Sequence, residues 1–380
     1  MCTSLFIYDI HPALLLLLTF NRDEFFDRPT QPAHFWPDEP FVLAGRDALR
    51  KGTWLGLTKH GRFSLLTNYR EPINAADPGK FEQTTAAPSR GALTTDFLTG
   101  SSSPLEYLQA LPHQDYFGFN LLAGDLRQQQ LAYVSNRGPT EPQLLPPGCY
   151  GISNGLLQQW PKVQKGLATL LQCLGLQPQG NNGNNNNNGT SQPESESQSQ
   201  PQSECAAANG NGASSSSGVR LADPGAEDCA AMGCAAAAAE PDAAAAAAAG
   251  SCGGGSSSNS GVLPWDALFH HVMGDTRKVG AGEELPLTGV GEETDRKLSS
   301  IFVEPFDMQP GVQYGTRSQT IIAVWRDGRV EQRERYIEKE EGHGQGGKHK
   351  WVWKEAKHSF HMTPAPQQQQ QQLDAGLCSA

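Results

Sequence analysis

The sequence predicts one α+β domain that is interrupted by a long low-complexity insertion. Three observations lead to this prediction. Short apolar runs separated by turn residues are typical of antiparallel strands and hairpins. Two segments combine helical spacing of apolar residues with start and stop signals. The composition changes abruptly after Leu176, where Gln, Asn, Ser, Gly and Ala take over until about Ser260.

Length and charge limit the classes of function. The chain has 380 residues, 37% of them hydrophobic, which is enough for a substantial core. A formal net charge of -11 repels polyanions, so no nucleic-acid partner is expected. The apolar run 13–20 is too short for a signal peptide or a transmembrane segment. Four of the cysteines lie in the low-complexity tract, which cannot hold the fixed geometry that disulfide bonds need; they are Cys205, Cys229, Cys234 and Cys252. A reduced, cytoplasmic chain is therefore expected.

The first element is a hairpin. Residues 4–10 and 13–20 have the pattern of two strands that turn at His11 and Pro12. Such a turn pairs residues whose numbers sum to roughly 21 to 22, so Cys2 is expected to face Thr19 or Phe20. A polar run, residues 21–24, follows directly. Local geometry is therefore expected to bring this run beside Cys2.

The other elements follow in chain order. Strands at 52–57 and 62–68 are expected to pair around Gly61. Ser103, followed by proline, marks one helix start, and a second helix begins at Pro161 and stops at Gly175. Further strands are expected at 119–123, 131–135, 149–153, 320–325, 330–337 and 351–354, and a third helix at 264–273.

These elements form a domain in two parts, residues 1–177 and 262–362. The insertion, 178–261, carries too little apolar surface to offset the entropy of ordering, so it is expected to be disordered. The same holds for the glutamine-rich tail, 363–380.

Cys2 is the candidate active centre. If the initiator methionine is removed, the thiol and the free α-amine belong to one residue. An α-amine titrates near ~8 and a thiol near ~8.5, so the amine can accept the thiol proton at neutral pH. A buried cysteine in an edge strand is the alternative interpretation of this position.

Several motifs resemble one known family. The start MCT, the run NRDEF at 21–25 and Arg28-Pro29 are similar to the NRDE signature of the transport and Golgi organization 2 family. Further blocks follow in family order: GTWLG (52–56), TNY (67–69), GFNL (118–121), NRG (136–138), YGISN (150–154), WPK (160–162) and YGTR (314–317). The resemblance covers 1–176 and 262–362. It implies a four-layer αββα sandwich of two antiparallel sheets between helices, the N-terminal-nucleophile hydrolase fold.

The resemblance also implies a catalytic set, because this fold is shared with cysteine amidases that act on penicillin V and conjugated bile acids. Cys2 is similar to their nucleophile, and Asp23 to the acid that orients its amine. Asn68 and Asn154 resemble the two asparagines of the site, although each is also a typical turn residue. Arg317 resembles a late supporting arginine. Carboxamide donors of this kind stabilise a developing oxyanion.

The remaining motif residues, Asn21, Arg22 and Glu24, are expected to alternate between faces. In extended chain Asn21 and Asp23 point one way, and Arg22 and Glu24 the other. The amidases carry an arginine three residues before the aspartate, where this sequence has Phe20. Because Arg22 faces away from Asp23, positive charge beside the thiol is expected to be missing.

No metal site is expected. The histidines at 270, 271, 358 and 361 and Cys229 with Cys234 form no complete ligand set. Residues 342–348 match the first seven places of a phosphate-loop pattern, but His349 stands where Ser or Thr is required, which favours a flexible loop. Hydrolysis would need no cofactor. Haem stays open as a carried ligand, held by a histidine or cysteine.

Three functions are consistent with these features. The first is an amidohydrolase of small amides or thioesters, and the second a carrier of haem or a lipid metabolite. The third is a scaffold in Golgi trafficking, with the insertion binding partners that the sequence does not name. The resemblance implies links to Golgi organisation, protein secretion, haem trafficking and mitochondrial metabolism, so association with Golgi or mitochondria is expected beside a cytoplasmic location.

Overall fold

A computed structural model describes residues 2–70, 88–138, 140–177, 262–280, 285–286, 290–340 and 350–363. The chain divides into two units, 1–180 with 260–380, and 181–259. All the described residues belong to the first unit. The predicted insertion, the tail after residue 363 and the loop 342–348 lie outside the described residues, so the predicted domain boundaries stay predictions.

Two antiparallel sheets form the centre of the first unit. In spatial order, the first sheet contains β10 (Gly148–Ile152), β1 (Thr3–Tyr8), β2 (Leu14–Phe25), β12 (Val312–Trp325), β13 (Arg329–Glu340) and β14 (Lys350–His361), with β11 (Phe306–Gln309) paired to β12. The second contains β3 (Thr30–Phe35), β4 (Val42–Asp47), β5 (Leu55–Thr58), β6 (Arg62–Asn68), β7 (Phe119–Asp125), β8 (Gln130–Ser135) and β9 (Gln143–Leu144).

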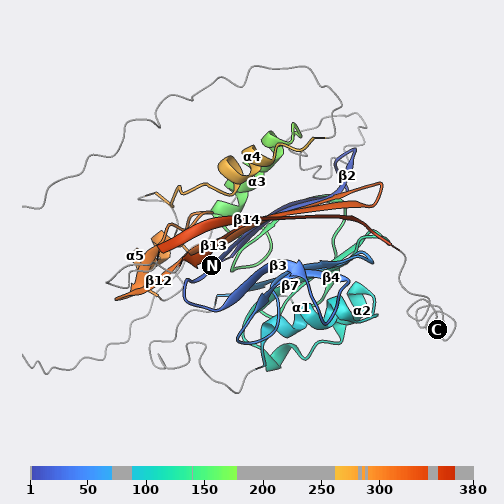
Figure 1. Cartoon of the computed structure of the whole chain (residues 1–380), viewed down its shortest axis with the longest axis horizontal. Coiled ribbons are helices and arrows are strands. Elements are labelled where there is room, and N and C mark those ends of the chain that lie inside the picture. The colour runs from blue at the N-terminus through green and yellow to red at the C-terminus, as the bar shows by residue number, and fades with distance from the viewer. Residues whose placement is uncertain are drawn as a thin grey trace, which may run out of the picture. The chain divides into compact units, whose positions relative to one another are not determined.

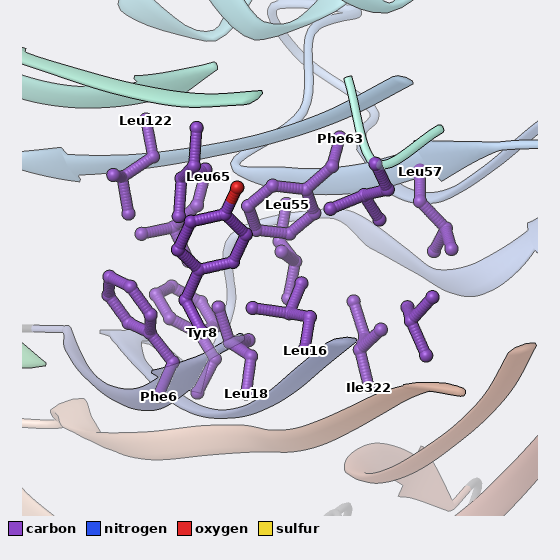
Figure 2. Packing of buried hydrophobic residues seen from close by; sticks show 14 of the residues in the cluster. Phe6, Tyr8, Leu16, Leu18, Leu55, Leu57, Phe63, Leu65, Leu122 and Ile322 are labelled. Carbon is purple, nitrogen blue, oxygen red and sulfur yellow. The ribbon is translucent and has the colours of Figure 1, made fainter. Parts of the chain in front are cut away.

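The sheets pack face to face through alternate side chains. Phe6 and Leu18 from the first sheet and Phe63 from the second are fully buried in one cluster, which Figure 2 shows from close by. Burying a side chain of this size contributes roughly 1.5–3 kcal/mol. The cluster therefore fixes which face of each strand points inward; it also includes Tyr8, Leu16, Leu55, Leu57, Leu65, Leu122 and Ile322.

Helices cover both outer faces (Figure 1). On the first sheet, Leu5 and Leu17 pack with α3 (Pro161–Cys173) and with the short α4 (Trp265–Ala267), which continues as the π-helical segment η3 (Leu268–Val272). On the second lie α1 (Arg90–Thr99) and α2 (Pro104–Gln109). The layers are thus helix, sheet, sheet, helix, and the predicted αββα sandwich is confirmed. Two short helices complete the description, η2 (His113–Asp115) and α5 (Glu292–Lys297).

Local signals in the sequence produce the expected starts and stops. Ser103 caps α2 in a reciprocal capping box with Glu106. Gly175, just after α3, has φ 65°, and Gly328, in the turn between β12 and β13, has φ 88°. Both glycines adopt the left-handed conformation that other residues rarely take. No helix among the described residues is long and apolar enough to cross a bilayer.

The register of the first hairpin differs from the prediction. Thr3 pairs with Asn21, and Ser4 with Phe20, so Cys2 lies beyond the last pair, toward Arg22 rather than Thr19 or Phe20. The predicted register is wrong because the loop is longer than a tight turn. Asp9 has φ 55°, and Nδ1 of His11 accepts the backbone N–H groups of residues 13 and 14. In addition, β2 continues through residues 21–25.

Candidate functional site

Cys2 is anchored at the start of β1. The hydroxyl of Ser153, at the end of β10, donates to the carbonyl of Cys2 at 2.8 Å and lies 3.3 Å from the hydroxyl of Thr3. The side chain of Cys2 is partly buried and packs against the cluster between the sheets. Burial raises the pKa of its thiol, whereas the amino terminus and Arg22 act to lower it. Burial therefore opposes ionisation of the thiol, and the two positive charges favour it.

Asp23 lies on the face of β2 opposite to Arg22, and the residue is 5% exposed. The hydroxyl of Thr316 donates to its Oδ1 at 2.7 Å, and the phenol of Tyr314 donates to its backbone carbonyl at 3.3 Å. Burial raises the pKa of this carboxyl; the amino terminus, Lys162 and the bond from Thr316 lower it. Asp23 is thus a buried acid whose ionisation depends on its neighbours.

A β-bulge in β12 shapes this part of the site. Thr316 pairs with Asp23 but Ser318 pairs with Arg22, so Arg317 is an extra residue between them. Its guanidinium donates to the carbonyl of Phe25 at 3.2 Å and also to the carbonyl of residue 28. The structure therefore places Arg317 in the turn after β2, and Thr316 is the residue of this block that contacts Asp23.

Arg22 faces away from Asp23, as the alternation predicts, but toward the side of the thiol. Its guanidinium lies 4.1 Å from the ring centroid of Trp54, a residue that borders the same cluster as Cys2. It also donates to Glu24 at 3.2 Å. Because the charge of Arg22 lowers the pKa of the Cys2 thiol, the expectation that positive charge is missing there is wrong.

The two predicted asparagines lie next to each other. Nδ2 of Asn154 donates to the backbone carbonyl of Asn68 at 2.6 Å, and the backbone carbonyl of Asn154 accepts the N–H of Arg70 at 2.8 Å. Asn154 directly follows Ser153, which binds Cys2, whereas Asn68 is exposed at the end of β6. The structure thus brings Cys2, Asn154 and Asn68 to one place, with Asp23 behind the strand.

Sequence reasoning did not single out four residues of this region. Ser153, Thr316 and Tyr314 hold Cys2 and Asp23 through the bonds above. The fourth, Lys162, is a buried lysine whose Nζ donates to two backbone carbonyls. All four lie inside the family blocks at 150–154, 160–162 and 314–317, which is the signal that could have found them.

Asn21 has a structural role. Its side chain is 1% exposed, and Nδ2 donates to the carbonyls of Met273 at 2.8 Å and Ile301 at 2.9 Å. Its Oδ1 accepts from Gln319 at 3.4 Å. Asn21 therefore fastens the part of the chain after residue 262 onto β2, directly beside Asp23.

Asn21→Ala is expected to lower the free energy of unfolding by about 2 kcal/mol, because the carbonyl of Ile301 loses a buried partner. Urea denaturation measures this change. Asn68→Ala is the matched control, since that side chain is exposed and little stability should be lost. Equal unfolding free energies for Asn21→Ala and the wild type would contradict the structural role.

Two small cavities lie among the described residues. A cavity of about 50 Å³ lies between Trp265, Phe269 and Arg333, and one of about 20 Å³ is bordered by Arg22 and Arg317. Among the described residues, no group of three or more His, Cys, Asp or Glu side chains could hold a metal ion.

The architecture defines the class of protein: a four-layer αββα sandwich of antiparallel sheets, with a cysteine leading the first strand, is the N-terminal-nucleophile hydrolase fold. Within this class the chain belongs to the family described as Transport and Golgi organisation 2, which matches residues 1–205 and 255–339.

Curated relatives carry the same name. The Transport and Golgi organization 2 homolog of Mus musculus is 38% identical over 176 residues, 43% of this chain and 60% of the relative. The homolog of Bos taurus is 38% identical, covering 46% of this chain and 64% of the relative. That of Homo sapiens is 37% identical with the same coverage. The chain thus spans less than two thirds of the length of these relatives.

A solved structure was also compared. The Caenorhabditis elegans N-acylethanolamine-hydrolyzing acid amidase (NAAA) ortholog covers 45% of this chain, and the match covers 79% of that protein. The TM-score is 0.32 and the sequence identity 12%, values too low to indicate a shared function.

Proposed function

We propose that the chain is an N-terminal cysteine amidohydrolase that cleaves a small non-peptide amide or thioester. One observation carries the proposal: Cys2, held by Ser153, lies at the start of β1 next to a buried acid, Asp23, on the neighbouring strand. A terminal amine at Cys2 would be oriented by the Asp23 carboxylate. The amine would then stand next to the thiol whose proton it has to accept.

The proposed reaction has two steps. The amine takes the thiol proton as the sulfur of Cys2 attacks the substrate carbonyl, and Arg22 stabilises the negative charge on sulfur. The leaving amine or thiol departs with that proton, and a thioester to Cys2 remains. Water then attacks the thioester, gives a proton to the amine and releases the acid and the thiol. The amide of Asn68, exposed beside Asn154, would donate to the oxyanion in both steps.

Selective alkylation tests the proposal. With limiting iodoacetamide near neutral pH, mass spectrometry is expected to show that Met1 is absent and that Cys2 reacts well before Cys149 and Cys173. Burial raises the pKa of the Cys2 and Cys149 thiols, to about 11 for Cys149, but only Cys2 would carry an amine on the same residue to accept the thiol proton, so Cys149 should react more slowly. The urea-unfolded protein, in which these cysteines should react alike, is the control. Retained Met1, or a Cys2 that reacts no faster than the others, would refute N-terminal-nucleophile catalysis.

A second candidate is a non-catalytic carrier of haem or a lipid metabolite. The raised pKa of the Cys2 thiol favours the carrier function, because a protonated thiol is a weak nucleophile but can still contact a bound ligand. Neither cavity described above could enclose haem, so haem would bind elsewhere on the protein. Adding haemin should produce a Soret band that is lost in Cys2→Ala; no band would exclude haem as cargo.

The location is part of the same proposal. The family name supports a role in transport and Golgi organisation. We propose a cytoplasmic protein that associates with Golgi or mitochondria. Cell fractionation with markers for each compartment tests this placement.

A further inference from the structure

Lys162 carries a charge at a place where both burial and the helix oppose it. The side chain is 4% exposed and lies in the first turn of α3, directly after Pro161. Helix dipoles favour cations at the C-terminal end, and an ammonium removed from water loses hydration energy. Its Nζ donates to the carbonyls of Leu298 at 3.2 Å and Ser300 at 3.1 Å. These neutral acceptors do not by themselves explain a charged side chain.

A single segment, residues 298–303, links Lys162 to Asp23. The carbonyls of Leu298 and Ser300 accept hydrogen bonds from Lys162. The carbonyl of Ile301 accepts one from Asn21. At its end the N–H of Val303 donates at 2.8 Å to the hydroxyl of Thr316, and that hydroxyl donates to Asp23 at 2.7 Å. The ammonium and the carboxylate thus hold opposite ends of one short segment beneath β2.

The two groups also act on each other electrostatically. Burial lowers the pKa of Lys162 to about 8, while Asp23 and Cys2 act to raise it and Arg70 to lower it. In turn, the pKa of Asp23, which burial raises, is lowered first by the amino terminus and next by Lys162. Burial raises the pKa of the other titratable groups on the strands packed against α3, Tyr8, Cys149 and Tyr150, and the exposed His270 and His271 lie on η3. The carboxyl of Asp275, shortly after η3, has its pKa lowered against burial by its bonds with Arg277 and, less, by the charge of Lys165 on α3.

We propose that Lys162 is a positioning residue: its buried ammonium keeps Asp23 ionised, and the ionised Asp23 holds the amine of Cys2. The part that concerns the amine rests on the proposed function. A protonated Asp23 is neutral and could no longer stabilise the ammonium group that forms when the amine takes the thiol proton. Removing the positive charge of Lys162 therefore leaves the thiol in place but takes away the group that orients its base.

The test is the titration of the Asp23 carboxyl by ¹³C NMR in protein labelled at aspartate, with the resonance assigned from Asp23→Asn. In Lys162→Met the midpoint is expected to rise by about one pH unit or more, whereas Lys162→Arg stays near the wild type. Lys165→Met, an exposed site one turn along the same helix, is the matched control and should not move the midpoint. An unchanged midpoint in Lys162→Met would overturn the proposal.

A second variant and a comparison with the reactivity of Cys2 separate the role of Lys162 from misfolding and from the proposed hydrolase function. If Lys162→Met does not fold, Lys162→Gln decides, because it removes the charge but keeps an N–H donor for the carbonyls of Leu298 and Ser300. The same rise of the Asp23 midpoint is expected there, and an unchanged midpoint would overturn the proposal. The NMR result does not depend on catalysis. An inert Cys2 with a shifted Asp23 midpoint would therefore reject the hydrolase alone, and a reactive Cys2 with an unshifted midpoint would reject only the role of Lys162.

Discussion

Cys2→Ala is expected to lower the hydrolysis of any amide or thioester that the wild-type protein cleaves by roughly 10⁴-fold or more, because removing a catalytic nucleophile leaves only binding and oxyanion stabilisation. The fold should survive. Cys2 is only partly buried, and its carbonyl would still accept from Ser153. Initial rates on a panel of small amides and thioesters, compared with denaturation midpoints, measure both effects.

The other cysteines provide the controls for this prediction. Cys149 and Cys173 pack against the cluster under α3, on the other face of the first sheet, so alanine at either place should leave turnover within a few-fold of the wild type. A Cys2→Ala protein that keeps most of its activity, with Met1 removed in the parent, would show that another group is the nucleophile.

The sequence predicted the elements that carry their own local signals. The Ser103 start of α2 and the proline start and glycine stop of α3 each depend on a few neighbouring residues. Strand β3 was missed because Pro32 interrupts its pattern and its pairing with β4 is irregular. Helix α1 was missed because its apolar side chains are not clearly confined to one face, and packing on β5 and β6 stabilises it instead.

The candidate site was predicted only in part, for a different reason. Family blocks identified Cys2, Asp23 and Asn154, but which of them face one another depends on two irregularities. The longer hairpin loop sets Cys2 toward Arg22, and the bulge at Arg317 puts Thr316 on Asp23. Neither irregularity has a signal in composition or periodicity. Each changes which side chains meet without changing the secondary structure.

Glu334, on β13, is a buried acid between the sheets. It is 3% exposed and accepts the N–H of Ala33 at 2.6 Å and the hydroxyl of Thr320 at 3.4 Å. Burial raises its pKa to about 7 from the ordinary value of 4.5, although both hydrogen bonds and Arg22 act to lower it. The folded protein therefore holds a proton that the unfolded chain releases between these two pH values.

This difference makes stability fall as the pH rises. Below pH 4.5 Glu334 is protonated in both states; between 4.5 and about 7 only the unfolded chain ionises, which favours unfolding. A folded-state pKa raised by this amount corresponds to a loss on the order of 3 kcal/mol across that window. Glu334→Gln cannot ionise, so its stability relative to the wild type should rise by that amount between pH 4.5 and 7.5.

Guanidinium denaturation at both pH values measures this relative change, since ionisations elsewhere cancel between the two proteins. Glu340→Gln, an exposed site on the same strand, is the matched control and should follow the wild type at both pH values. If Glu334→Gln and wild type change in parallel, Glu334 is already ionised at pH 4.5. Arg22 would then have to supply its countercharge, and less of that guanidinium's charge would be available to the thiol of Cys2.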